Sequence, residues 1–214
     1  MRTKTDAAKM VALLKEAYPV EICSLDYADA WQLLVAVRLS AQCTDARVNQ
    51  ITPVLFARYP TLQALADAPL DEIEGIIRSC GFYHSKAKDL KATAQILCEK
   101  YEGLVPKTME ELLALPGVGR KSANLILGDV YHVPGVVIAD THCIRISNRL
   151  GFLASKDPLK VENALRKALP AEESNDFCHR LVLHGRAVCT ARTAHCSRCV
   201  LDALCPKKGV KQAD

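Results

Sequence analysis

The chain has 214 residues, of which 50% are hydrophobic, and its formal net charge is +4. This length allows a substantial core in one large domain or two small ones, and the composition excludes an intrinsically disordered chain. No apolar run is long enough to span a membrane, and the N-terminal residues lack the apolar core of a signal peptide. We therefore expect a cytoplasmic globular protein. The net charge alone is too small to indicate a nucleic-acid partner.

Apolar residues recur at helical spacing along most of the chain. A first helix is expected to follow a cap at Asp6 and to run to Ala17. Further helices are expected, in chain order, at residues 33–39, 45–51, 53–59, 62–66, 71–79, 85–101, 108–114, 122–131, 141–150, 158–168 and 172–187. Thr52 and Pro53 predict a break at which a new helix starts, because proline suits the first helical position. The only strand-like run, residues 136–138, is short enough to be a loop, so we predict an all-α fold.

A glycine-containing hairpin, residues 115–121 (Leu-Pro-Gly-Val-Gly-Arg-Lys), lies between two of these helices. Gly117 and Gly119 have no Cβ, which allows a backbone to come close to a ligand. The unpaired N–H groups that open the following helix favour an anion such as a phosphate. Lys121 lies just inside that helix, where a cation is unfavourable, so its position indicates chemistry rather than helix stability. The alternative is an ordinary corner with a solvated lysine.

Four of the ten cysteines form a cluster near the C-terminus, with the spacing C-x6-C-x2-C-x5-C. They are Cys189, Cys196, Cys199 and Cys205. Zinc sites usually use two closely spaced pairs, whereas one pair with two outlying cysteines is more typical of a four-iron cluster. Zinc and purely structural thiols are the alternatives. The remaining cysteines are isolated in apolar stretches, where free thiols pack like small hydrophobic groups.

Positive charge is concentrated in the same C-terminal region. From Arg186 to Lys211 the chain carries six Lys or Arg and a single acidic residue, Asp202. The loop between the first two clustered cysteines contains Arg192 and ends at His195. We expect it to present a rigid basic tip, with a solvated loop as the alternative.

These motifs together resemble the endonuclease III family, the DNA glycosylases and abasic-site lyases of the helix-hairpin-helix superfamily. The resemblance rests on the hairpin at 115–121, Ala-Asp-Thr-His at 139–142 and the cysteine spacing at 189–205. It extends to residues 33–45, with Ser-Ala-Gln-Cys-Thr-Asp at 40–45, and to Gly-Phe-Tyr-His-Ser-Lys-Ala at 81–87. The match covers nearly the whole chain, in the order that the family has.

The resemblance implies two helical domains on either side of a DNA-binding cleft. Residues 22–134 would form a six-helix barrel that contains the helix-hairpin-helix at about residues 108–127. Residues 1–21 and 135–214 would form a discontinuous iron–sulfur domain, with a [4Fe-4S] cluster held by the loop at 189–205. The implied partner is damaged double-stranded DNA, with no membrane, and the implied protein is a monomer in a bacterial-type cytoplasm, associated with the nucleoid.

The resemblance also implies a catalytic pair. Lys121 would attack C1′ of the damaged nucleoside, displace the base and form a Schiff base from which the strand breaks by β-elimination. The attacking amine must be neutral. Asp140 would stabilise positive charge on the sugar or relay a proton. An aspartate at this position is also a good helix N-cap, and the two roles are compatible.

Further residues are expected to contact the DNA. A damaged base must leave the stack, and the resemblance implies that Gln42 fills the space it vacates. A wedge enters from the opposite side; Phe82 is the nearest match and Tyr83 the next, although the family commonly has an aliphatic residue there. An aromatic ring packed beneath a loop is the alternative for Phe82. Phosphate contacts are expected from Leu115, Gly117, Val118, Gly119 and Arg120 of the hairpin, and from Arg192, His195 and Arg198 near the cysteines.

The implied activity is base excision repair of oxidised pyrimidines in duplex DNA. The first alternative is a mismatch-specific adenine or thymine glycosylase of the same superfamily, and the lysine at 121 counts against it. The second is a non-catalytic DNA-binding module, which the presence of both Lys121 and Asp140 disfavours.

Overall fold

The computed structural model describes residues 2–20, 23–211 and 213–214. Over these ranges it contains eleven α-helices, four short 3-10 turns and no strand, only isolated bridges of Ala194 with Cys189 and Ala213. The prediction of an all-α fold is confirmed, and residues 136–138 form a loop. In the described ranges no helix has the length and apolar character needed to cross a membrane.

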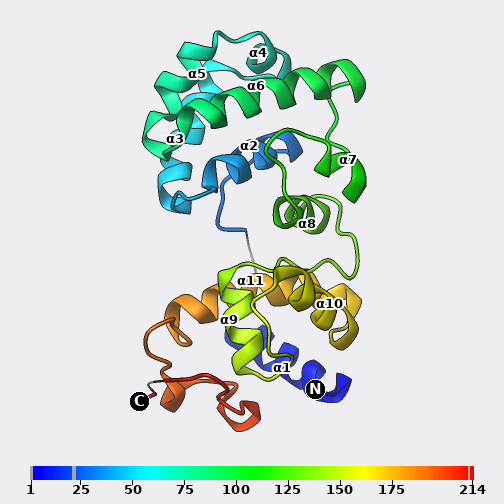
Figure 1. The fold of residues 1–214 in the computed structure, drawn as a ribbon, viewed down its shortest axis with the longest axis vertical. Helices are drawn as coiled ribbons and strands as arrows, with labels where there is room; N and C mark the ends of the chain where they lie inside the picture. The colour runs from blue at the N-terminus through cyan, green and yellow to red at the C-terminus, as the bar shows by residue number, and fades with distance from the viewer. Residues whose placement is uncertain (1, 21–22, 212) are drawn as a thin grey trace. The chain divides into compact units, whose positions relative to one another are not determined.

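The chain divides into two compact units. The central unit is residues 23–131, and the terminal unit combines residues 1–22 with residues 132–214. Figure 1 shows the helices of each unit. Those of the central unit are α2 (Ala30–Ser40), α3 (Asp45–Arg58), α4 (Leu62–Asp67), α5 (Leu70–Ile77), η1 (Arg78–Cys80), α6 (Tyr83–Lys100), α7 (Met109–Leu113) and α8 (Arg120–Asp129).

Helix α2 is the core helix of the central unit. Its residues from Leu33 to Val37 are all buried, as is Leu39. A helix that is apolar on every side must be surrounded, and α2 packs against α3, α6 and α8. The ends of α2 and α6 thereby come close to the loops that carry the candidate site residues.

The predicted break at Thr52 and Pro53 is wrong, because α3 runs without interruption from Asp45 to Arg58. Pro53 has no N–H to donate to the carbonyl of Asn49, and a proline inside a helix costs about 3 kcal/mol. Thr52 and Leu55, on either side of it, are buried. Tertiary packing of this face therefore outweighs the local preference of the proline.

The terminal unit is built around the contact of α11 with α1 and α9. Its elements are α1 (Lys4–Ala17), α9 (Thr141–Arg149), α10 (Pro158–Ala168), η2 (Ala171–Glu173), α11 (Ser174–Ala187), η3 (Cys196–Arg198) and η4 (Asp202–Leu204). A Cβ at Gly185 would lie 2.4 Å from His142 Nδ1, so only glycine lets α11 pass this close to α9.

Helix α1 begins three residues earlier than the expected cap at Asp6 implies. Thr3 is the N-cap, and its Oγ1 accepts a hydrogen bond from the Asp6 N–H at 3.1 Å. Asp6 returns the contact by accepting from the Thr3 N–H, so the two residues form a capping box. Asp6 is the third helical residue, and the predicted cap is corrected to Thr3.

Candidate functional site

The hairpin joins α7 to α8 and leaves the start of α8 open. Gly119 is the N-cap in an extended conformation and provides no side-chain cap. A helix start of this kind favours an anion such as a phosphate. Arg120 and Lys121 are the first two helical residues, and both side chains are exposed.

Gly117 occupies a position that a side chain could not share. Its φ is +71°, and a Cβ would lie 2.3 Å from Arg38 Nε and 2.7 Å from Asp89 Oδ2. These two side chains pair with each other, since Arg38 Nε donates to Asp89 Oδ2 at 2.8 Å. A Cβ at Gly119 would meet open space. The two glycines therefore differ in purpose: Gly117 permits contact with an internal ion pair, whereas Gly119 leaves the helix start accessible.

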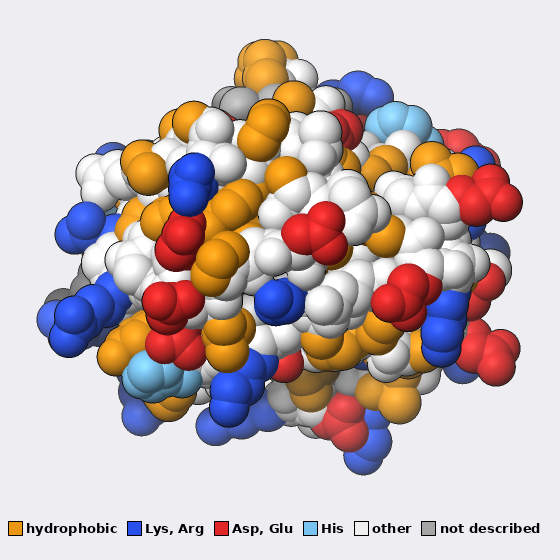
Figure 2. Space-filling model, turned by 90° about the horizontal axis from the view of Figure 1, so that it is seen from above, with side chains coloured by type: hydrophobic (Ala, Val, Ile, Leu, Met, Phe, Trp, Pro, Cys, Tyr) orange, Lys and Arg blue, Asp and Glu red, His pale blue; other side chains and the backbone are white. Residues whose placement is uncertain are grey.

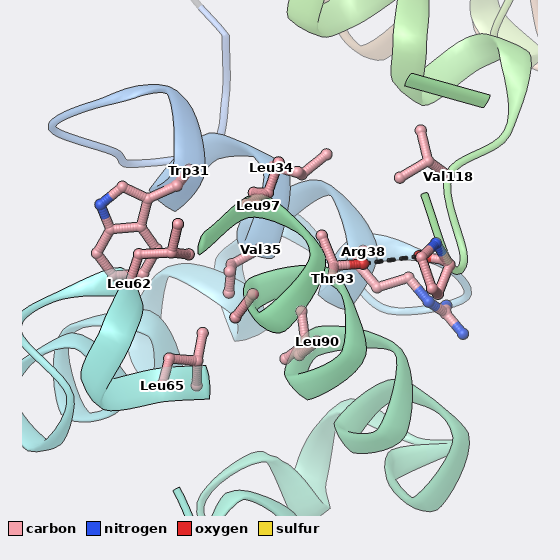
Figure 3. Close-up of a pocket in the computed structure, with 12 residues that line it drawn as sticks. Trp31, Leu34, Val35, Arg38, Leu62, Leu65, Leu90, Thr93, Leu97 and Val118 are labelled. Atoms are coloured by element: carbon pink, nitrogen blue, oxygen red, sulfur yellow. Dashed lines mark hydrogen bonds between the residues drawn. The ribbon is translucent and has the colours of Figure 1, made fainter. Parts of the chain in front are cut away.

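The hairpin is also attached to α6. Thr93 Oγ1 donates to the carbonyl of Pro116 at 3.2 Å. Figure 3 shows this contact beside a narrow, mainly apolar pocket, which Trp31 and Val118 help to line. Residues of α2 and α6 face each other across this pocket, so the hairpin rests on the same two helices that support the other loops of the central unit.

Gln42 and Phe82 share an unusual backbone conformation. Their φ angles are +55° and +47°, in the left-handed region that non-glycine residues rarely adopt. Both side chains are exposed, Phe82 by 66%. The alternative of a ring packed beneath a loop is therefore wrong for Phe82. Such strain persists only where the surroundings impose it, and it is concentrated at functional sites.

Tyr83, the second candidate for the wedge, is held against its neighbours. Its ring lies 4.1 Å from that of His84, centroid to centroid, and the guanidinium of Arg78 lies 5.9 Å from its centroid. The Tyr83 side chain is partly buried. Of the two aromatic residues, Phe82 is the one that projects into solvent.

In the terminal unit, Asp140 is the N-cap of α9. Its Oδ1 accepts a hydrogen bond from the Cys143 N–H at 2.7 Å, and its backbone is extended. The four residues before it, 136–139, are buried and fix the approach of the chain. The capping role is therefore real, and it fixes the direction of the carboxylate for any second role.

The four clustered cysteines line a single small hollow. Within the described ranges, no three His, Cys, Asp or Glu side chains converge on a point suited to one metal ion. Sulfurs arranged around a space suit a group of several atoms. Burial raises the pKa of Cys199 to about 11, and the pKa of Cys205 rises for the same reason, with neighbouring thiols adding to both effects. Ionising these thiols together requires a positive charge that a metal group would supply.

The loop after Cys189 is stabilised by a hydrogen bond within it and by hydrogen bonds from Arg149. Thr190 Oγ1 donates to the Thr193 carbonyl at 2.6 Å, and Arg149, which is buried, donates to the Thr190 carbonyl at 2.7 Å. Arg149 Nη1 also donates to Cys189 Sγ at 3.1 Å. Arg192 is exposed on this loop. The loop is hydrogen bonded and carries an exposed basic residue, whereas its rigidity stays a prediction.

His195 and Arg198 both have polar partners within the terminal unit. His195 Nδ1 lies 2.8 Å from Asp214 Oδ2, and Arg198 Nη2 donates to the Ala187 carbonyl at 2.9 Å. Their contribution to DNA binding stays a prediction, and each would have to keep or exchange its present partner.

Sequence reasoning did not single out Arg38, Lys86, Asp89 or Arg149. Lys86 and Arg149 are buried, at 1% and 7% exposure. The available signal was a basic residue on an otherwise apolar helical face: Lys86 precedes Ala87 and Leu90, and Arg149 follows Ile146.

Comparison with known proteins shows to which protein family the chain belongs. The family model of the HhH-GPD superfamily of base excision DNA repair proteins matches residues 35–171, which include the hairpin, Lys121 and Asp140. The chain therefore belongs to this superfamily. Endonuclease III of Synechocystis sp. is 46% identical over 95% of this chain and 93% of that protein. Endonuclease III of Haemophilus influenzae is 42% identical over 96% and 97%.

A solved structure described as a trapped endonuclease III–DNA covalent intermediate matches the fold with a TM-score of 0.89. It is 40% identical in sequence, and the match covers 97% of both chains. The protein is a member of the endonuclease III family. It is accordingly a base excision repair enzyme, a DNA glycosylase with abasic-site lyase activity.

We expect Gly117→Ala to lower the free energy of unfolding by about 2 kcal/mol or more, because alanine disfavours positive φ and its Cβ would displace the Arg38–Asp89 pair. Gly119→Ala is the matched control; its Cβ meets open space, and the change at an N-cap should cost less than about 1 kcal/mol. Denaturant unfolding of both variants measures the difference. Equal losses would contradict the separate purposes of the two glycines.

Proposed function

We propose that the protein removes oxidised pyrimidines from duplex DNA and cleaves the resulting abasic site through a Schiff base on Lys121. The observation that carries the proposal is the placement of Lys121, exposed in the first turn of α8 directly after an uncapped hairpin. A phosphate bound at Gly117 to Gly119 would bring the adjacent sugar near its amine. The covalent DNA intermediate described for a similar protein supports a covalent mechanism for this chain.

The reaction follows from the chemistry of an amine and a nucleoside. The Lys121 lone pair forms a bond to C1′ as the C1′–N bond to the base breaks, and the base leaves with that electron pair and takes up a proton. The attacking nitrogen then loses a proton, and its lone pair forms the C1′=N bond of the Schiff base as the C1′–O4′ bond breaks and O4′ takes up a proton. Loss of a proton from C2′ then expels the 3′ phosphate by β-elimination. Asp140 would stabilise positive charge at C1′ or carry a proton, from the orientation that its capping bond fixes.

Affinity for DNA is proposed to come from the basic groove of the terminal unit. This groove is lined by Thr141, next to Asp140, and contains no acidic residue; its basic residues are Arg145, Arg149, Lys156, Arg192, Lys208 and Lys211. Such contacts set affinity and its dependence on salt, without selecting a lesion. By contrast, Figure 2 shows a face on which acidic and basic side chains are intermixed. The relatives named above are bacterial, which supports a location with the bacterial chromosome.

We further propose that Cys189, Cys196, Cys199 and Cys205 bind a [4Fe-4S] cluster. Their spacing, one close pair with two outlying cysteines, supports a cluster over zinc, and all four line one hollow. When bound, the cluster would supply the positive charge that keeps the thiols ionised. Its structural consequence would be to fix the loop that presents Arg192 to a phosphate.

A mismatch glycosylase of the same superfamily is the nearest alternative, and a non-catalytic DNA-binding module is the second. Neither alternative forms a Schiff base through the lysine at position 121. Covalent trapping therefore separates the proposal from both.

Incubation with duplex DNA that contains an abasic site, in the presence of borohydride, should give a covalent protein–DNA adduct, because hydride reduces the Schiff base. The adduct should disappear in Lys121→Gln, which removes the nucleophilic amine. Lys88→Gln, an exposed lysine on α6, is the control and should form the adduct normally. Denaturing gel electrophoresis detects the product. The parent protein failing to form any adduct would refute the lyase mechanism.

Asp140→Asn should lower the rate of base excision about 100-fold or more while leaving stability nearly unchanged. Asparagine caps a helix as well as aspartate does, but it cannot carry a proton or a negative charge. Single-turnover assays on duplexes with one defined oxidised pyrimidine, together with thermal unfolding, separate the two effects. If excision survives in the folded variant, capping is the whole role of Asp140.

Protein purified without oxygen should be brown and contain iron and inorganic sulfide in equal amounts. Cys196→Ser should lose both the visible absorbance and the iron, because it removes one ligand, whereas Cys98→Ser on α6 should keep them. Metal analysis and visible spectra provide the measurement. Stoichiometric zinc without iron would overturn the cluster assignment.

A further inference from the structure

Lys86 is a buried lysine that holds two main-chain carbonyls. Its side chain is 1% exposed, and Nζ donates to the carbonyls of Leu39 and Cys80, each at 2.8 Å. A buried ammonium group is costly unless it is hydrogen bonded, and here two strong acceptors serve it. Lys86 lies 47 residues from Leu39 in sequence, so this contact joins distant parts of the central unit.

The two carbonyls belong to the turns that present Gln42 and Phe82. Leu39 lies in the last turn of α2, shortly before Gln42, and Cys80 ends η1, shortly before Phe82. Carbonyls at helix ends lack partners within the helix, and Lys86 supplies one for each turn. Burial raises the pKa of the Cys80 thiol, and the neighbouring Cys43 thiol adds to this effect, so Cys43 of one turn lies near Cys80 of the other. The two turns are therefore joined at their bases.

Lys86 is one of three polar residues at helical spacing on α6. Asp89, one turn further, pairs with Arg38 beneath Gly117, and Thr93, a turn beyond that, donates to Pro116. Residues three and four apart lie on one face of a helix. Figure 3 shows Arg38 and Thr93 beside the hairpin. One face of α6 thus supports all three loops of the central unit that carry proposed DNA contacts.

We infer that Lys86 is a positioning residue that makes Gln42 and Phe82 enter the DNA stack as one rigid unit when a damaged base leaves it. Lys86 itself touches neither the DNA nor the reacting atoms. The strained backbones at residues 42 and 82 are kept in place because the carbonyls at the bases of their turns share one donor. Presenting both residues in fixed positions reduces the ordering that binding would otherwise require. The inference rests on the proposed glycosylase function.

The test compares Lys86→Met with Lys91→Met. Methionine keeps much of the side-chain length and leaves the carbonyls without their donor. Lys91 is the matched control, because it lies on the same helix and its Nζ donates to a carbonyl, that of Ala68 at 2.7 Å, away from both turns. Each protein is assayed on one oxidised pyrimidine in a fully paired duplex and on the same lesion in an unpaired bubble. A bubble needs no filling of vacated space, because its base is already unstacked.

We expect Lys86→Met to lose about 100-fold in single-turnover excision from the paired duplex and less than about threefold from the bubble. Lys91→Met should keep the parent's ratio between the two substrates. Equal loss of Lys86→Met on both substrates, or the same selective loss in Lys91→Met, would overturn the inference. A parent protein that excises from neither substrate and forms no borohydride adduct would instead refute the proposed function.

A second measurement covers the case in which Lys86→Met does not fold. Gln42→Ala, Phe82→Ala and the double variant alter only exposed side chains of the parent. If the two residues insert as one unit, the double variant should lose about as much excision from the paired duplex as the more impaired single variant. A loss equal to the product of the single losses shows independent insertion and overturns the inference.

Discussion

The ion pair between Arg38 and Asp89 determines where the hairpin lies. It joins α2 to α6, with both side chains mostly shielded from solvent, and the hairpin backbone passes so close that only glycine fits at position 117. Helix α8 begins three residues later, at Arg120, and Lys121 follows. The position of the proposed nucleophile therefore depends on charges that never meet the DNA. Charge-assisted hydrogen bonds of this kind are short and directional, which suits them to fixing a loop.

In both units, buried basic side chains donate hydrogen bonds to main-chain carbonyls of loops and helix ends. Lys86 holds two carbonyls in the central unit, and Arg149 holds the carbonyls of Thr190 and Ala191 in the terminal unit. Arg180 does the same for Tyr18 at the end of α1. Basic residues of this chain thus include side chains that donate to main-chain carbonyls and exposed side chains, such as Arg192, that are proposed to bind phosphates. This division explains why a net charge of only +4 says little about nucleic-acid binding.

The helices were largely predictable from sequence, and the long-range contacts were not. Apolar spacing indicated α2, α6 and α10 because each buries a continuous face. The prediction at Pro53 failed because burial of the flanking residues overrode a local preference, and the cap at Asp6 was displaced because a capping box uses two residues. The candidates in the motifs were identified by their resemblance to a family. Arg38 and Lys86 were missed because their partners lie 51 and 47 residues away, and spacing along a chain carries no signal for such pairs.

The left-handed backbone at Gln42 and Phe82 limits which residues evolution or engineering can place there. Glycine would relieve the strain but leave nothing to enter the stack, and asparagine tolerates the conformation better than most side chains. Valine and isoleucine are the poorest choices, since branching at Cβ makes positive φ most costly. An aliphatic wedge at position 82 is therefore restricted to unbranched Cβ, as in leucine or methionine. The main-chain conformation at positions 42 and 82 therefore restricts which side chains could make the proposed contacts within the DNA stack.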